Sequence, residues 1–115
     1  MSYRVLIFDD DQNIRKLMWT LFDSRGYEVF TFPHPGSCPL NHVDNCLCSE
    51  GESCSDVIIS NLEMPNLNGL DFIEKQVKKG CRCSNIALMS GNITDAQTVR
   101  AQSLESQIFN KPIDI

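Results

Sequence analysis

The chain has 115 residues, of which 42% are hydrophobic and 22% charged, and its formal net charge is −5. This length suits one domain over residues 1–115, and the composition is typical of a soluble globular protein. The acidic balance argues against a nucleic-acid partner. No signal peptide and no apolar run of about 20 residues is present, which argues against a membrane span, so we expect a cytoplasmic protein.

Short apolar runs alternate with amphipathic segments along the chain. Residues 4–8 form an apolar run that predicts a strand, and three aspartates follow it. From Asp11 onward the apolar residues recur at helical spacing, and Gly26 supplies the end of this helix. Residues 27–32 predict a further strand, ended by prolines. The stripe expected to face the core in the first helix consists of Ile14, Leu17, Met18, Leu21 and Phe22.

In the middle of the chain, an irregular segment is followed by a clearly predicted strand. Residues 36–55 have poor apolar periodicity and contain four of the six cysteines, so we predict no helix there. Residues 56–60 predict a strand, because Val57, Ile58 and Ile59 form a β-branched apolar run typical of a strand covered on both faces in a parallel sheet. Asn61 stands at the tip of this strand. A turn then leads into a helix whose expected stripe is Leu67, Leu70, Ile73 and Val77.

The last third repeats the alternation of strand and helix. Residues 86–89 predict a strand that ends at Ser90, and residues 107–110 predict the last strand. Between them a helix is expected over residues 93–104, with a thin stripe. Alternating strands and helices predict an α/β fold with a doubly wound parallel sheet. The thin stripe consists of Ile93, Ala96 and Val99.

Polar side chains follow four of the predicted strands. They are Asp9 and Asp10, Asn61, Ser90, and Lys111. The carboxyl ends of parallel strands share one edge of a sheet, so these residues can converge. Paired acids hold a hard cation, while serine and lysine side chains contact phosphate oxygens. The pattern indicates a metal-assisted phosphoryl site.

These motifs resemble the receiver domain of two-component response regulators. Besides the acidic pair, they include the turn from Glu63 to Gly69, the Ser90–Gly91 pair and the Lys111–Pro112 pair. The resemblance implies a flavodoxin-like fold with five strands in the order 2-1-3-4-5, and a cis peptide bond before Pro112. It also implies a histidine kinase or another signalling protein as partner, together with an output domain.

The resemblance extends over residues 3–112, and only residues 113–115 follow Pro112. We therefore expect the last helix of that fold to be missing or truncated, as in a shortened chain or a piece of a longer protein. A missing helix would leave one face of the sheet partly bare, which would allow a homodimer through that patch.

The resemblance also implies a role for each polar residue at the strand ends. Asp10 corresponds to the main Mg²⁺ ligand, assisted by Asp9 through water and by the backbone carbonyl of Glu63. Ser90 and Lys111 correspond to the residues that contact the phosphoryl group.

The family's phosphoryl acceptor is an aspartate, and Asn61 occupies its position. A neutral amide oxygen is a far poorer nucleophile than a carboxylate, and the change removes a metal ligand, so Mg²⁺ should be weak or absent. Ser60 points to the opposite face, and Glu63 lies beyond the strand. We therefore predict a module, not an enzyme, that signals through protein contacts. The alternative is an ordinary phospho-accepting receiver into which an Asp→Asn change at 61 was introduced.

Two further residues bear on this prediction. Ile108 occupies a switch position that is often aromatic in the family, and the expected signalling face runs over residues 93–111. Trp19 lies off the apolar stripe of its helix and is expected to be partly exposed.

The cysteines raise a separate question. Two C-x-C pairs precede neighbouring strands, and their convergence would suit a tetrahedral Zn²⁺. Three other states remain open: thiols packed as small hydrophobes, disulfides, and a redox cluster. A metal or redox sensor on a receiver scaffold is thus a third functional hypothesis. The first-choice ligands are Cys46, Cys48, Cys81 and Cys83, with Cys38, His42 and Cys54 in reserve.

Overall fold

The computed structural model describes residues 3–34, 55–64, 68–81, 83 and 85–110. Within them, five parallel strands form one sheet in the order β2-β1-β3-β4-β5, which confirms the predicted flavodoxin-like fold class. The expectations for residues 36–54, for the bond before Pro112 and for the end of the chain lie outside the described residues. The strands are β1 (Arg4–Phe8), β2 (Glu28–Phe32), β3 (Val57–Asn61), β4 (Ile86–Ser90) and β5 (Gln107–Asn110).

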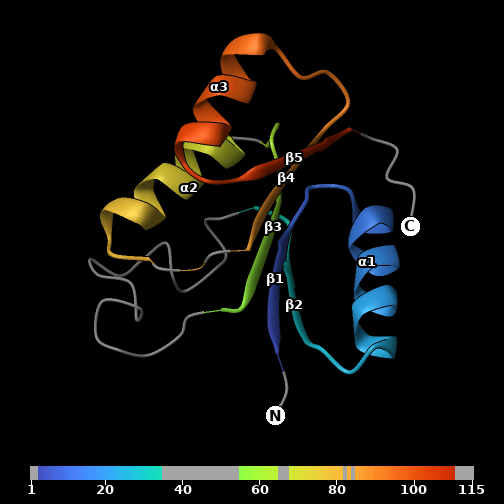
Figure 1. The fold of residues 1–115 in the computed structure, drawn as a ribbon. Helices are drawn as coiled ribbons and strands as arrows, with labels where there is room; N and C mark the ends of the chain where they lie inside the picture. The colour runs from blue at the N-terminus through green and yellow to red at the C-terminus, as the bar shows by residue number, and fades with distance from the viewer. Residues whose placement is uncertain (1–2, 35–54, 65–67, 82, 84, 111–115) are drawn as a thin grey trace.

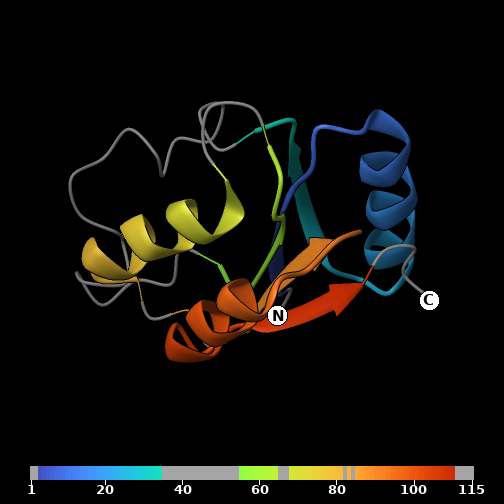
Figure 2. The ribbon, with the colours of Figure 1, turned by 90° about the horizontal axis from the view of Figure 1, so that it is seen from above.

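Helices cover both faces of this sheet (Figures 1 and 2). Helix α1 (Gln12–Ser24) lies on one face, while α2 (Gly69–Lys78) and α3 (Asp95–Ser103) lie on the other. None of the helices in the described part of the chain is long and apolar enough to cross a membrane.

Strand alternation divides the buried side chains between two cores. Leu6 and Phe8 of β1 belong to the core under α2 and α3, whereas Val5 and Ile7 belong to the core under α1. β3 divides in the same way. A strand that is buried on both faces reads as a continuous apolar run, which is why these strands were recognisable in the sequence.

Four residues of the predicted helix stripes are exposed, so these predictions are wrong in part, and the predicted Leu67 lies outside the described residues. Leu17 is 55% exposed, Val77 44% and Val99 66%. In α3 the buried residue is Ala101, and the predicted Ala96 is exposed as well. The physical reason is that α3 is short and contacts the core with one small side chain. A capping box at Thr94 specifies where this helix begins.

Gly69 allows α2 to start directly against the end of β3. A Cβ atom at this position would lie 2.6 Å from the backbone oxygen of Asn61. The Gly69 N–H donates to the backbone oxygen of Leu62 at 2.8 Å, and Asn68 caps the helix by accepting from the Asp71 N–H. The turn after β3 is thereby fixed close to Asn61.

Candidate functional site

The carboxyl ends of β1, β3 and β4 lie side by side, because β3 sits between the other two in the sheet. Asp10 follows β1, while Asn61 and Ser90 are the last residues of β3 and β4. The structure thus brings these three positions to one edge. Lys111, which the sequence also places there, lies outside the described residues.

The side chain of Asn61 joins two of the other predicted site residues. It is only 6% exposed. Its Nδ2 donates to the backbone oxygen of Glu63 at 2.7 Å and to Oδ1 of Asp10 at 3.2 Å. The amide therefore lies between the Asp10 carboxylate and the Glu63 backbone carbonyl.

The three aspartates after β1 differ in their surroundings. Asp9 is fully buried, and its Oδ1 accepts from the Asp11 N–H at 2.9 Å. Asp11 caps α1 by accepting from the Asn13 N–H at 2.8 Å. Asp10 is exposed and directs Oδ1 toward Asn61. Two of the three carboxylates thus shape the start of α1, and Asp10 faces the site.

Arg15 is a residue near this edge that the sequence analysis did not single out. Its Nη1 donates to the backbone oxygen of Asp9 at 2.7 Å. The contact ties the first turns of α1 to the loop that carries the acids. A cation one helical turn after the capping Asp11 was the only signal in the sequence.

Ser90 is fully buried and is held from two sides. Its Oγ donates to Oε1 of Glu63 at 2.9 Å and accepts from the Asn92 N–H at 3.1 Å. The sequence predicts a role only for the backbone carbonyl of Glu63. The contact between Ser90 and the Glu63 carboxylate could not be predicted from it.

Ser60 takes no part in this arrangement, as strand alternation predicts. It is fully buried, its Oγ donates to the backbone oxygen of Asn61 at 3.0 Å, and it lies against the start of α2 near Gly69. Its hydroxyl therefore lies away from the contact between the Asn61 and Asp10 side chains.

Two oxygens at this edge that could bind a divalent cation are hydrogen-bonded to Asn61. Asp10 and the Glu63 carbonyl would have to supply oxygen ligands, but both already accept from the Asn61 amide. Across the described ranges, no three His, Cys, Asp or Glu side chains are arranged to hold a metal ion.

The cysteines that can be located lie at the opposite, amino end of the strands. Cys81 and Cys83 are half-buried and pack against the core under α2. The Cys83 Sγ lies 3.5 Å from the backbone oxygen of Asp56. Among the described residues, neither cysteine belongs to a group that could hold a metal ion, so the structure does not support the zinc prediction. The other candidate ligands lie outside the described residues: Cys38, His42, Cys46, Cys48 and Cys54.

Comparison with known proteins agrees with this geometry. Residues 5–115 match the family described as the response regulator receiver domain. The chain is 37% identical over 75 residues to the nisin biosynthesis regulatory protein NisR of Lactococcus lactis subsp. lactis, covering 65% of this chain and 29% of that protein. It is 28% identical over 104 residues to the sensory/regulatory protein RpfC of Xanthomonas campestris pv. campestris, covering 87% of this chain and 13% of RpfC.

Solved structures show the same fold. The chemotaxis protein CheY4 of Vibrio cholerae superposes with a TM-score of 0.77 at 22% identity, covering 99% of this chain and 90% of CheY4. The receiver domain of the hybrid histidine kinase CckA superposes with a TM-score of 0.69 at 23% identity, covering 97% and 88%. The chain therefore spans nearly all of these structures but only a small part of the curated relatives.

Proposed function

Because this chain belongs to the response regulator receiver domain family, we propose that it is a receiver of a two-component or phosphorelay system that takes no phosphate and acts through protein contacts. The receiver assignment comes from the family. The loss of phosphorylation is our inference from Asn61, which stands where the family carries its acceptor aspartate.

The chemistry of the side chain at position 61 supports the loss of phosphorylation. A carboxylate attacks phosphorus through an anionic oxygen, whereas the amide of Asn61 is neutral and its nitrogen lone pair is delocalised. Both Nδ2 contacts, to Asp10 and to the Glu63 carbonyl, also use the amide as a donor. The side chain therefore links the loop that carries Asp10 to the turn that carries Glu63.

The Asn61 amide also occupies the position next to Asp10 and the Glu63 carbonyl that a bound cation would need. Its N–H groups satisfy the Asp10 carboxylate and the Glu63 carbonyl without a metal. A bound cation would have to displace these hydrogen bonds and would face one carboxylate fewer. The two hydrogen bonds donated by Asn61 Nδ2 are the observation that carries the proposal.

The Ser90 hydroxyl is also engaged within the chain. The family resemblance gives this hydroxyl the role of contacting the phosphoryl group, yet here the Glu63 carboxylate accepts from it at 2.9 Å. Both the hydroxyl and the amide are thus engaged within the chain. We propose that the end of β4 is held in one arrangement whether or not a phosphodonor is present.

The test is intact-protein mass spectrometry after incubation with Mg²⁺ and acetyl phosphate. We expect no phosphate adduct on the unchanged chain and one phosphate on the Asn61→Asp variant. Asn61→Asp combined with Asp10→Asn is the matched control, which should lose the adduct again. A phosphate adduct on the unchanged chain would refute the proposal. A native spectrum of the same sample would reveal any bound zinc.

The alternative is a phospho-accepting receiver in which Asn61 replaces a native aspartate. The presence of Asp9, Asp10 and Ser90 around position 61 favours it, because two acids and a hydroxyl would suit a working site. The codon for residue 61 in the native gene separates the two hypotheses. In either case we propose a histidine kinase or another signalling protein as partner, with the face over residues 93–111 as the contact.

A further inference from the structure

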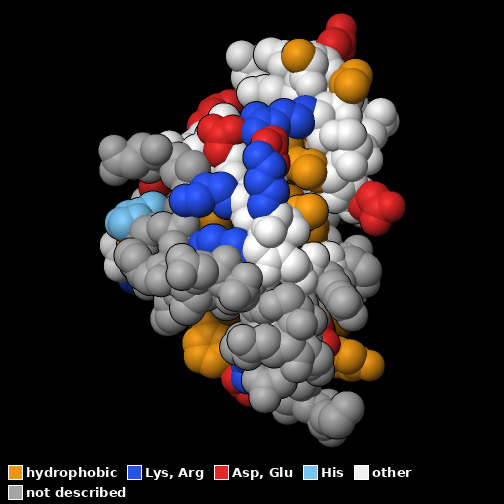
Figure 3. All heavy atoms as spheres, turned by 90° about the vertical axis from the view of Figure 1, so that its left-hand side faces the viewer, with side chains coloured by type: hydrophobic (Ala, Val, Ile, Leu, Met, Phe, Trp, Pro, Cys, Tyr) orange, Lys and Arg blue, Asp and Glu red, His pale blue; other side chains and the backbone are white. Residues whose placement is uncertain are grey.

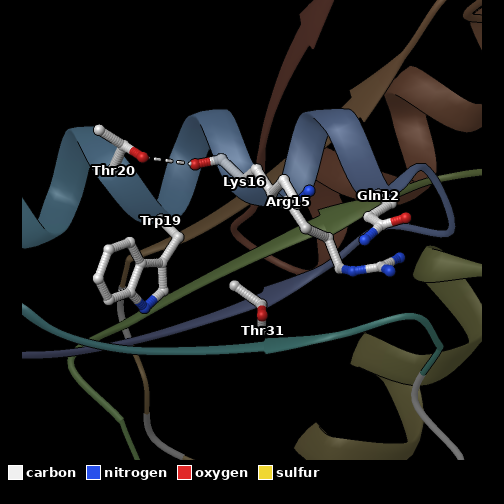
Figure 4. A pocket seen from close by; sticks show the side chains of 6 residues that line it. All are labelled: Gln12, Arg15, Lys16, Trp19, Thr20 and Thr31. Carbon is white, nitrogen blue, oxygen red and sulfur yellow. Dashed lines mark hydrogen bonds between the residues drawn. The ribbon is translucent and has the colours of Figure 1, made fainter.

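A groove lies between α1 and β2, on the side of the molecule away from α2. Its volume is about 370 Å³. Figure 4 shows Trp19 and Arg15 reaching from α1 toward β2, with Thr31 of β2 between them. The lining residues are Gln12, Arg15, Lys16, Trp19, Thr20 and Thr31.

The helical residues of this lining form a second face of α1. Counted from Gln12, they fall at i, i+3, i+4, i+7 and i+8, which is one side of a helix. Trp19 belongs to this face and is 44% exposed, so its indole has open surface on which another ring can stack. Helix α1 thus packs on the sheet with one stripe and lines a groove with the other.

The groove is cationic in an acidic chain. Arg15 and Lys16 both line it, although the net charge of the whole chain is −5. The contact between Arg15 Nη1 and the Asp9 backbone oxygen fixes the guanidinium while leaving its other N–H groups for a ligand. No ion pair joins Lys16 to any other residue of the described ranges.

We propose that this groove binds an aromatic phosphate ester of the size of a nucleoside monophosphate. The ring would stack on Trp19, and the phosphate would accept from Arg15 and Lys16, since two neighbouring cations suit a doubly charged phosphate better than a single carboxylate. Thr31, which lies between Trp19 and Arg15, provides a hydroxyl for the hydrogen-bonding groups between ring and phosphate. The volume lies near the lower end of the range of about 300–1,000 Å³ for small-molecule sites.

The chain carries its own reporter for this test, because Trp19 is its only tryptophan. AMP would be titrated in a buffer with EDTA while the Trp19 fluorescence is recorded, with adenosine and inorganic phosphate as the ring-only and anion-only probes. We expect saturable quenching by AMP with a Kd of about 0.1 mM, and binding at least about tenfold weaker for each partial probe. No saturation by AMP, or an equal response to adenosine, would overturn the proposal.

Variants locate the site. Lys16→Gln should weaken AMP binding about tenfold, the expected loss of one charge-assisted hydrogen bond. Lys75→Gln, which removes an exposed lysine on α2 across the sheet, is the matched control and should leave the Kd unchanged. Trp19→Leu, followed by calorimetry and checked for folding by circular dichroism, should also lose affinity. Equal affinities for Lys16→Gln and the unchanged chain would contradict the proposed location.

Discussion

The Asn61 side-chain nitrogen donates the two hydrogen bonds that tie the end of β3 to Asp10 and to Glu63. Asn61→Asp would replace two donated hydrogen bonds by a carboxylate facing Asp10 and the Glu63 carbonyl. Without a cation we expect a loss of about 1–3 kcal/mol from repulsion and unpaired acceptors. Adding Mg²⁺ should raise the Tm of this variant and leave the Tm of the unchanged chain where it was. An equal Mg²⁺ response in the two proteins would contradict our account.

There is no room for a side chain at Gly69. A methyl group there would lie 2.6 Å from the Asn61 backbone oxygen and 3.1 Å from both Leu88 Cδ2 and Ser60 Oγ. We expect Gly69→Ala to cost about 1–3 kcal/mol, because backbone must shift. Gly91→Ala is the control: nothing lies within 4 Å of its Cβ position, so its effect should stay within about 0.5 kcal/mol. Urea denaturation measures both, and equal effects would disprove the steric argument.

Gln76 is a polar residue in an apolar position. It is 1% exposed, and neither its Nε2 nor its Oε1 finds a hydrogen-bond partner in the described part of the chain. Gln76→Met keeps the shape and removes the buried amide, so we expect a gain of about 1 kcal/mol in the free energy of unfolding. Gln102→Met, at an exposed site on α3, should change it little. A destabilised Gln76→Met variant would mean that the amide is satisfied.

At the scale of elements, one ion cluster links α2 to α3. The Arg100 Nη2 lies 2.6 Å from Asp71 Oδ1 and 2.7 Å from Glu74 Oε2, and Lys78 lies 3.2 Å from Glu74. Figure 3 shows basic and acidic side chains interleaved on the face that carries α2. Hydrogen bonds from Arg100 and then Lys78 lower the pKa of Glu74, and hydrogen bonds to Glu74 and Asp71 raise the pKa of Arg100.

This cluster predicts that the docking of α3 depends on pH. Because the pKa of Glu74 is lower in the folded state than its ordinary value of 4.5, its contribution is present above 4.5 and is lost as the pH falls through the folded-state pKa. Arg100→Gln should therefore lower the Tm at neutral pH, and the difference should shrink below pH 4.5. Arg25→Gln, at an exposed position after α1, is the control. A pH-independent effect of Arg100→Gln would contradict the role of Glu74.

At the scale of the whole molecule, the group formed by Asp10, Asn61, Glu63 and Ser90 exists only through contacts between segments that are distant in the sequence. Asp10 and Asn61 are 51 positions apart, and Glu63 and Ser90 are 27 apart. The parallel registers of β1, β3 and β4 bring them together, so any change that shifts β3 against its neighbours would separate all of them.

The sequence by itself determined the order of strands and helices, the residues at the strand ends and the absence of a carboxylate at position 61. Periodicity and strand ends are local properties, because backbone geometry repeats within a few residues. The tertiary structure decided which helix residues are buried, that Glu63 accepts from Ser90, why position 69 must be glycine and how Trp19 and Arg15 frame a groove. These features depend on which side chains meet across the sheet, and no local pattern encodes such a meeting.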